Sequence, residues 1–242
     1  MSALPLMLLH GWGAHAGVWS EVIGRMDLGQ SVIAPDYPAD RTVDGSINDV
    51  LDRLAGLVPE ACVVAGWSLG GQLALQLALR YPRRIRKLIL ISTTPRFVSA
   101  PDWPCGMDKA VFSAFADALP ANPGQALRRF LLLQTQGDAQ ARTVVRKLEI
   151  LHSALPDPDQ PALLQTLDWL RVTDLRAVLP EVAQPALVMH GDCDRITPLS
   201  AGEYLAAQLA DARLECIAGA AHVPFVSDPD AFSRRFTEFC NE

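Results

Sequence analysis

The chain has 242 residues, of which 50% are hydrophobic and 20% are charged, and its net charge is −6. This composition excludes a fibrous repeat and a mainly disordered chain, and the length fits one globular domain. The negative net charge argues against binding to nucleic acid over a broad surface.

Six short apolar runs predict strands that are buried on both faces. In chain order they cover residues 6–9, 31–35, 62–65, 88–92, 186–190 and 213–217. Helical patterns accompany them at 18–26, 47–57, 69–80, 202–210 and 230–239. The alternation predicts an α/β protein with a mostly parallel sheet and helices on both faces. Such sheets bind ligands beyond the carboxyl ends of their strands, so the turns that follow strands are the first places to search.

The alternation stops between about residues 93 and 180, where only helical patterns occur, at 111–119, 125–134, 139–152 and 161–170. We predict a helical cap, inserted after the strand that ends near Ser92, over one end of the sheet. The expected division is a core of residues 1–95 and 180–242 and a cap of residues 96–179 that forms one compact unit. The alternative is that these helices are ordinary sheet-covering helices.

The cysteine pattern and the N-terminal residues bear on location. The five cysteines include no C-x-x-C pair, and an odd count fits neither a disulfide framework nor a zinc site, which indicates a reducing compartment. The N-terminal apolar run is too short for a signal-peptide core or a membrane span. We therefore expect a cytoplasmic monomer with no metal, no nucleic-acid partner and no membrane partner.

A G-x-S-x-G motif lies between a predicted strand and a predicted helix, with Ser68 at its centre and Gly66 and Gly70 on either side. Small residues at these two positions let the chain turn sharply, and the turn lifts the serine hydroxyl off the sheet. The hydroxyl then lies beside a helix N-terminus, where free amides favour negative charge. The amide of Leu69 points to where an oxyanion would form. The simpler reading is a glycine-rich turn in which Ser68 caps the helix.

A nucleophilic serine needs a histidine base and a carboxylate that orients the base. His222 lies in a loop of small residues after the last predicted strand, where a base can be presented. Asp192 and Asp194 both follow the strand at 186–190. We favour Asp194, because Asp192 directly follows a glycine and is better placed to hold the turn. The order Ser, Asp, His along the chain is that of α/β-hydrolases.

The loop after the first strand, His10-Gly11-Trp12-Gly13, is expected to supply the second oxyanion donor. The amide of Trp12 would pair with that of Leu69, and the indole ring would form a wall of the acyl pocket. We expect His10 to have a structural role within this loop.

The same loop also matches a relaxed dinucleotide-binding fingerprint, G-x-G-x-x-A at 11–16, with Asp36 at the end of the next strand. A nucleotide-binding oxidoreductase is therefore a competing hypothesis. This fingerprint does not explain why Ser68, Asp194 and His222 all follow strands in hydrolase order. A third possibility is a non-catalytic binding protein with a hydrolase fold, but such proteins usually lack a member of the triad.

Five segments carry a family resemblance, at 8–13, 66–71, 92–104, 129–137 and 220–229. On these segments the chain resembles the α/β-hydrolase superfamily. Within it, the chain is similar to the biotin-pathway carboxylesterases that demethylate pimeloyl-[acyl-carrier protein] methyl ester. The segments at 92–104 and 129–137, both in the predicted cap, carry most of the specificity. The chain differs at its start, where one or two edge strands of the family are expected to be missing.

The resemblance implies Ser68, Asp194 and His222 as the catalytic triad. Ester hydrolysis by such a triad needs no metal or organic cofactor, so we expect none. It also implies a set of substrate contacts: Trp12, Leu69, Phe130, Leu131, Leu132, Leu133, Gln134 and His222. Three cap arginines, Arg129, Arg142 and Arg146, match positions that hold the acyl carrier protein in this family. A fourth arginine of the family corresponds to Gln125 here. Other esters, thioesters, lactones and carbon–carbon bonds are alternative substrates for the same triad.

The charge pattern gives independent support for an acidic partner. Residues 121–150 contain five basic and two acidic side chains on a chain that is acidic as a whole. Arg142 and Arg146 are four residues apart, so they share one helix face. A basic patch of this kind suits a small acidic protein, although a solvated helix face is the alternative.

Overall fold

The computed structural model of the chain describes residues 4–26, 29–37, 46–58, 61–153 and 159–242. Its centre is one sheet of six parallel strands in the order β2-β1-β3-β4-β5-β6. The strands are β1 (Leu6–Leu9), β2 (Val32–Ile33), β3 (Cys62–Trp67), β4 (Ile85–Ile91), β5 (Ala186–Gly191) and β6 (Ala212–Ile217). The predicted parallel sheet is therefore confirmed. No strand precedes β1 in the described residues, and β2 forms that edge of the sheet.

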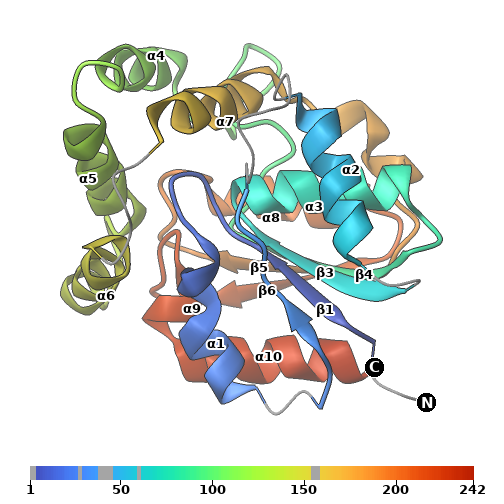
Figure 1. Ribbon diagram of the computed structural model, residues 1–242. Coiled ribbons are helices and arrows are strands. Elements are labelled where there is room, and N and C mark those ends of the chain that lie inside the picture. The colour runs from blue at the N-terminus through green and yellow to red at the C-terminus, as the bar shows by residue number, and fades with distance from the viewer. Residues whose placement is uncertain (1–3, 27–28, 38–45, 59–60, 154–158) are drawn as a thin grey trace.

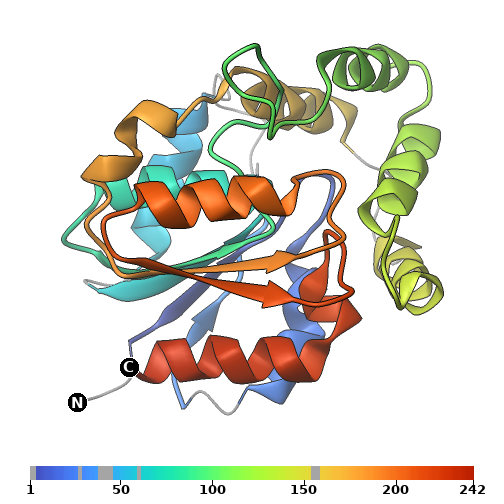
Figure 2. The same cartoon turned by 180° about the vertical axis from the view of Figure 1, so that it is seen from behind.

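Helices cover both faces of this sheet, as the two opposite views show (Figures 1 and 2). One face carries α2 (Ile47–Leu57), α3 (Leu69–Arg80) and α8 (Leu199–Gln208). The other carries α1 (Ser20–Arg25), after the short helix η1 (Ala16–Trp19), with α9 (Pro224–Ser227) and α10 (Pro229–Asn241). Each face has its own cluster of buried apolar side chains. The strands β1, β3 and β5 are buried along their whole length and are almost entirely apolar, because neither of their faces meets water.

Four helices follow β4 and lie toward one end of the sheet, outside the two covering layers (Figure 1). They are α4 (Lys109–Ala118), α5 (Pro123–Gln134), α6 (Ala141–Ser153) and α7 (Gln160–Val172), and the short helix η2 (Arg176–Glu181) leads on to β5. Their starts follow local chemistry, since the side chains of Asp108 and Asn122 accept backbone amides at the first turns of α4 and α5. None of the described helices is long and apolar enough to cross a membrane.

The segment that carries these four helices starts and ends at one place. Arg96, after β4, and Asp174, after α7, form an antiparallel bridge and also an ion pair of 2.7 Å. Arg176 pairs with Asp174 at 2.8 Å and lies over the ring of Trp103. Buried residues of the segment pack into both apolar clusters of the sheet layers. The division into a core and a cap of residues 96–179 stays a prediction, and this bridge supports it.

Candidate active site

Ser68 lies at the turn between β3 and α3 in a backbone conformation that few residues adopt. Its φ is 55° and its ψ is −116°, in a region that side chains with a Cβ normally avoid. The turn is held from both sides. The Ser68 amide donates to the carbonyl oxygen of Ile91 at 2.9 Å, and the Thr93 hydroxyl donates to the Ser68 carbonyl oxygen at 2.6 Å. The surrounding structure therefore maintains a strained serine at the carboxyl end of the central strand.

The glycines of the motif are required by close backbone contacts. A Cβ on Gly66 would lie 2.1 Å from the carbonyl oxygen of Gly70. A Cβ on Gly70 would lie 2.3 Å from the carbonyl oxygen of Leu9 and 2.7 Å from that of His10. The start of α3 therefore packs directly against the end of β1. This contact places the loop that contains Trp12 next to the serine turn.

His222 and Asp194 form a buried pair. The distance from His222 Nδ1 to Asp194 Oδ2 is 2.8 Å, and both side chains are almost fully buried. The other carboxylate oxygen, Oδ1, accepts the amides of Ile196 at 2.9 Å and Thr197 at 3.0 Å. Burial alone would raise the pKa of Asp194, but the nearby imidazoles of His222 and His190 and the hydrogen bonds that the carboxylate accepts together outweigh it, so the pKa lies below its ordinary value. Asp194 is thus held as an anion that fixes the imidazole ring.

His222 is joined to the serine turn through Trp67. The Trp67 indole donates to the His222 carbonyl oxygen at 2.8 Å, and the two rings lie 5.7 Å apart. His222 Nε2 is buried and has no hydrogen-bond partner among the described residues, and the Ser68 hydroxyl has none either. With Nδ1 donating to Asp194, Nε2 carries the free lone pair that a base needs. Hydrogen bonds between such groups commonly tighten only when the substrate binds.

Asp192 holds the loop in place, as its position beside Gly191 predicted, and does not contact His222. Its carboxylate accepts the amide of Gly219 at 2.7 Å and so links the loop after β5 to the loop after β6. A Cβ on Gly191 would lie 2.2 Å from the carbonyl oxygen of Ala220, which shows how closely these two loops pack. Asp194, rather than Asp192, is the carboxylate that contacts His222.

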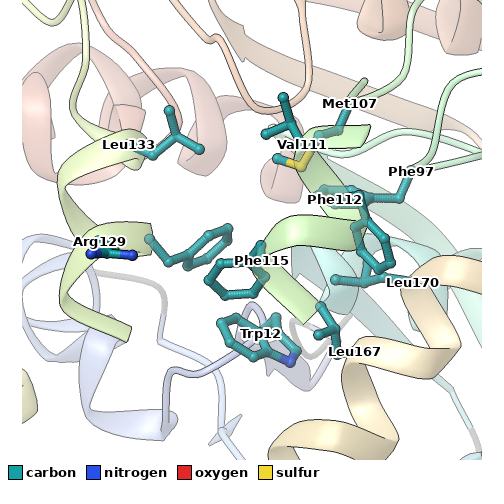
Figure 3. Close-up of a pocket in the computed structure, with 11 residues that line it drawn as sticks. Trp12, Phe97, Met107, Val111, Phe112, Phe115, Arg129, Leu133, Leu167 and Leu170 are labelled. Carbon is teal, nitrogen blue, oxygen red and sulfur yellow. The ribbon is translucent and has the colours of Figure 1, made fainter. Parts of the chain in front are cut away.

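An apolar cavity of about 90 Å³ lies between the Trp12 loop and the helices after β4 (Figure 3). Figure 3 shows Arg129 and Leu133 on one side of it, and Val111 and Phe112 on the other. Trp12 forms its floor, where the indole packs edge-on against Phe115 and Phe130. The full lining is Trp12, Phe97, Met107, Val111, Phe112, Phe115, Arg129, Phe130, Leu133, Leu167 and Leu170.

The predicted substrate contacts divide into two groups. Trp12, Phe130 and Leu133 line this cavity, whereas Leu69, Leu131, Leu132, Gln134 and His222 do not. Leu131 is buried in the opposite apolar cluster, and Leu132 is 49% exposed to solvent. Gln134 contacts the candidate base itself, because its carbonyl oxygen accepts the His222 amide at 3.1 Å.

His10 is part of the loop structure. Its Nδ1 lies 2.8 Å from the carbonyl oxygen of Gly11, and its ring stacks on Tyr37 at 4.1 Å. Burial lowers the pKa of His10 to about 4, so the ring is neutral at pH 7. In the competing nucleotide fingerprint, Gly11 packs against the Trp67 ring and Asp36 accepts the amide of Ala16. The residues of the fingerprint are therefore used in packing within the chain.

The predicted basic patch is smaller than its sequence suggests. Arg128 pairs with Glu149 at 3.6 Å, and Lys147 pairs with Glu21 at 2.8 Å. Arg129, Arg142 and Arg146 are exposed and form no ion pair within the described part of the chain. These are the three arginines that the family resemblance singles out.

Comparison with known proteins agrees with this geometry. A family model described as "Alpha/beta hydrolase family" matches residues 6–235. The chain belongs to the alpha/beta hydrolase family. This hydrolase is 36% identical to the pimeloyl-[acyl-carrier protein] methyl ester esterase of Nitrosospira multiformis, over 97% of this chain and 93% of the relative. It is 38% identical to the protein of the same name from Aromatoleum aromaticum, over 95% of each chain.

Solved structures show the same fold for this hydrolase. An esterase from Exiguobacterium antarcticum superposes with a TM-score of 0.84 at 23% identity, covering 100% of this chain and 93% of the other. A hydrolase from Pseudomonas aeruginosa superposes with a TM-score of 0.79 at 26% identity, covering 99% and 91%. The predicted α/β-hydrolase fold is thereby confirmed.

Proposed function

We propose that this hydrolase is a serine carboxylesterase that removes the methyl group from pimeloyl-[acyl-carrier protein] methyl ester and releases methanol in biotin synthesis. The observation that carries the chemistry is the buried Asp194–His222 pair, which a hydrogen bond from Trp67 links to the turn of the strained Ser68. The substrate follows from relatives that carry this name and align over nearly the whole chain. The proposal includes a cytoplasmic location and a monomeric enzyme.

In the proposed mechanism, His222 Nε2 takes the proton of Ser68 as the hydroxyl oxygen attacks the ester carbonyl. Asp194 keeps the proton on Nδ1 and stabilises the imidazolium that forms. His222 then protonates the departing methanol, and a water molecule repeats the sequence to free the carboxylate. The hydrolysis uses only these side chains and backbone amides, so no cofactor is required.

The amides of Trp12 and Leu69 are the proposed oxyanion donors. The close contact between Gly70 and the end of β1 supports this pairing, because it brings the two turns together. Leu69 is the first residue of α3, so its amide has no partner within the helix. Removal of one donor of this kind typically lowers turnover by about 10²–10³.

The apolar cavity is the proposed site for the methylene chain of the acyl group. Its lining includes the aromatic rings of Trp12, Phe115 and Phe130, which suit a chain without charge. Arg129 is the cationic residue among the lining side chains. Together with Arg142 and Arg146 it forms the proposed docking surface for the acidic carrier protein.

Reversal of two surface charges tests the partner. The double variant Arg142→Glu/Arg146→Glu should raise the KM for the carrier-bound ester and leave hydrolysis of a p-nitrophenyl ester unchanged. Arg234→Glu on α10 is the matched control, because Arg234 is also exposed and lies outside the segment after β4. Equal losses on both substrates would contradict docking at this surface.

Two further measurements test the reaction itself. Wild-type protein should release methanol from the carrier-bound ester and restore growth of a biotin auxotroph that lacks this esterase. Ser68→Ala should abolish both while the protein stays folded. Efficient hydrolysis of short esters without any turnover of the carrier-bound ester would instead indicate a general carboxylesterase.

A further inference from the structure

The connection between α5 and α6 is fastened to the loop that carries His222. Three hydrogen bonds join the two segments. The His222 amide donates to the Gln134 carbonyl oxygen at 3.1 Å, and the Ala139 amide donates to the Gly219 carbonyl oxygen at 2.8 Å. The Ala221 amide donates to the Asp138 carboxylate at 2.8 Å. The last of these uses a side chain, so it is the link that a substitution can remove.

Asp138 is 8% exposed, and no basic side chain forms an ion pair with it in the portion of the chain that the structure covers. A buried carboxylate without a cation is unfavourable unless hydrogen-bond donors surround it. Its Oδ1 accepts the amide of Gln140 at 2.7 Å. Its Oδ2 accepts the Ala221 amide and the Ser227 hydroxyl. The two oxygens thus have separate tasks, one in the local turn before α6 and one in the loop of His222.

We propose that Asp138 is a positioning residue that fixes the loop of residues 219–222 and thereby the ring of His222. This inference rests on the proposed function, in which His222 is the base. The donor from Ala221 directly precedes His222 in the chain, so loss of this bond loosens the backbone on one side of the imidazole. The bond to Asp194 restrains the ring, and the bond from Asp138 restrains the backbone that carries it.

The same link connects the base to the helix that lines the cavity. Gln134 ends α5, whose residues Arg129, Phe130 and Leu133 face the acyl site. A displacement of α5 is therefore transmitted to the His222 loop through residues 134–139. One continuous segment, α5 with residues 134–139, therefore contacts both the proposed carrier-protein surface and the loop of the base.

The test uses the full-length enzyme and p-nitrophenyl butyrate, which does not require the carrier protein. In Asp138→Ser the shorter hydroxyl can still accept the Gln140 amide but does not reach Ala221. We expect kcat to fall by about tenfold or more while KM changes less than about twofold, because a small displacement of a catalytic group is costly. Asp138→Asn keeps one oxygen acceptor but turns an NH2 group toward the amide of either Gln140 or Ala221, so its kcat should lie between those of Asp138→Ser and the wild type.

Two controls separate positioning from folding. Asp228→Ala removes another carboxylate that accepts a backbone amide, that of Ala231 at 3.0 Å, but has no hydrogen bond to the loop of residues 219–222 within the described residues. It should lower the melting temperature and leave kcat unchanged. The rate at which a fluorophosphonate labels Ser68 should fall in Asp138→Ser in parallel with kcat.

The outcomes are distinct. Wild-type kcat in Asp138→Ser, or an equal loss in Asp228→Ala, would overturn the positioning role. Should Asp138→Ser not fold, Asp138→Glu moves the carboxylate by one methylene and keeps its charge, and a wild-type kcat in that variant would also overturn it. Failure of wild-type Ser68 to react with the fluorophosphonate would overturn the proposed function, and the inference with it.

Discussion

The strained backbone of Ser68 leads to a test of stability that does not depend on activity. Ser68→Gly and Ser68→Ala both remove the hydroxyl, which has no hydrogen bond among the described residues. They differ in whether residue 68 has a Cβ. At φ 55° and ψ −116° a residue with a Cβ carries strain of about 1–3 kcal/mol, and glycine carries almost none.

Glycine also makes the unfolded chain more flexible, which costs about 0.4–1 kcal/mol. The net expectation is that Ser68→Gly is more stable than Ser68→Ala by about 1–2 kcal/mol. For a chain of this size each kcal/mol corresponds to about 2–4 °C in Tm. At an unstrained position the alanine variant would instead have the larger free energy of unfolding.

Thermal and urea unfolding of the two variants, followed by circular dichroism, measure this difference. Both variants should be inactive, so neither is confounded by substrate. A Ser68→Ala protein that is as stable as Ser68→Gly, or more stable, would refute the conclusion that the turn holds its central residue under strain.

Three further predictions concern the base, the cavity and pH. Asp194→Asn should lower kcat by about 10⁴ with little change in fold, because an amide in place of the carboxylate favours the wrong imidazole tautomer. Steady-state kinetics measures the loss of kcat, and a loss below about tenfold would contradict the role of Asp194. Leu133→Trp should fill part of the cavity and raise KM for p-nitrophenyl octanoate but not for the acetate, and equal changes would place the acyl chain elsewhere. Burial lowers the pKa of His10 from 6.5 to about 4. As the pH falls, His10 therefore becomes protonated in the unfolded chain before it does in the folded chain, and the free energy of unfolding decreases between about pH 6.5 and pH 4. At pH 5 this amounts to about 2 kcal/mol, and His10→Gln should lack that part of the pH dependence of unfolding.

Most of the fold could be predicted because its elements have strong local patterns. The strand 6–9 and the helices 47–57 and 69–80 coincide with β1, α2 and α3. β4 begins at Ile85, three residues before the predicted start. The prediction began too late because Arg86 and Lys87 interrupt the apolar run. Lys87 is accommodated in the strand because its ammonium group donates to the Phe239 carbonyl oxygen at 2.9 Å.

The sequence predicted some residues of the candidate site and missed others. Ser68, Asp194 and His222 could be named because each follows a strand, and parallel strands present these ends at one edge. The substrate contacts at 130–134 stay a prediction, and only part of this run lines the cavity, because consecutive residues of a helix point about 100° apart. Phe130 and Leu133 share a face, together with Arg129, and Leu131 and Leu132 point elsewhere. The sequence contained no signal for Asp138, because its partner Ala221 lies 83 residues away.

The bridge between Arg96 and Asp174 has a consequence for how such enzymes diversify. The whole segment between these residues leaves and rejoins the rest of the chain at a single pair of adjacent backbones. The strands of the sheet and the turn at Ser68 all lie outside that segment. Selectivity for the acyl donor can therefore evolve by replacement of the segment between Arg96 and Asp174, provided that each new segment again supplies hydrogen bonds to the loop of residues 219–222.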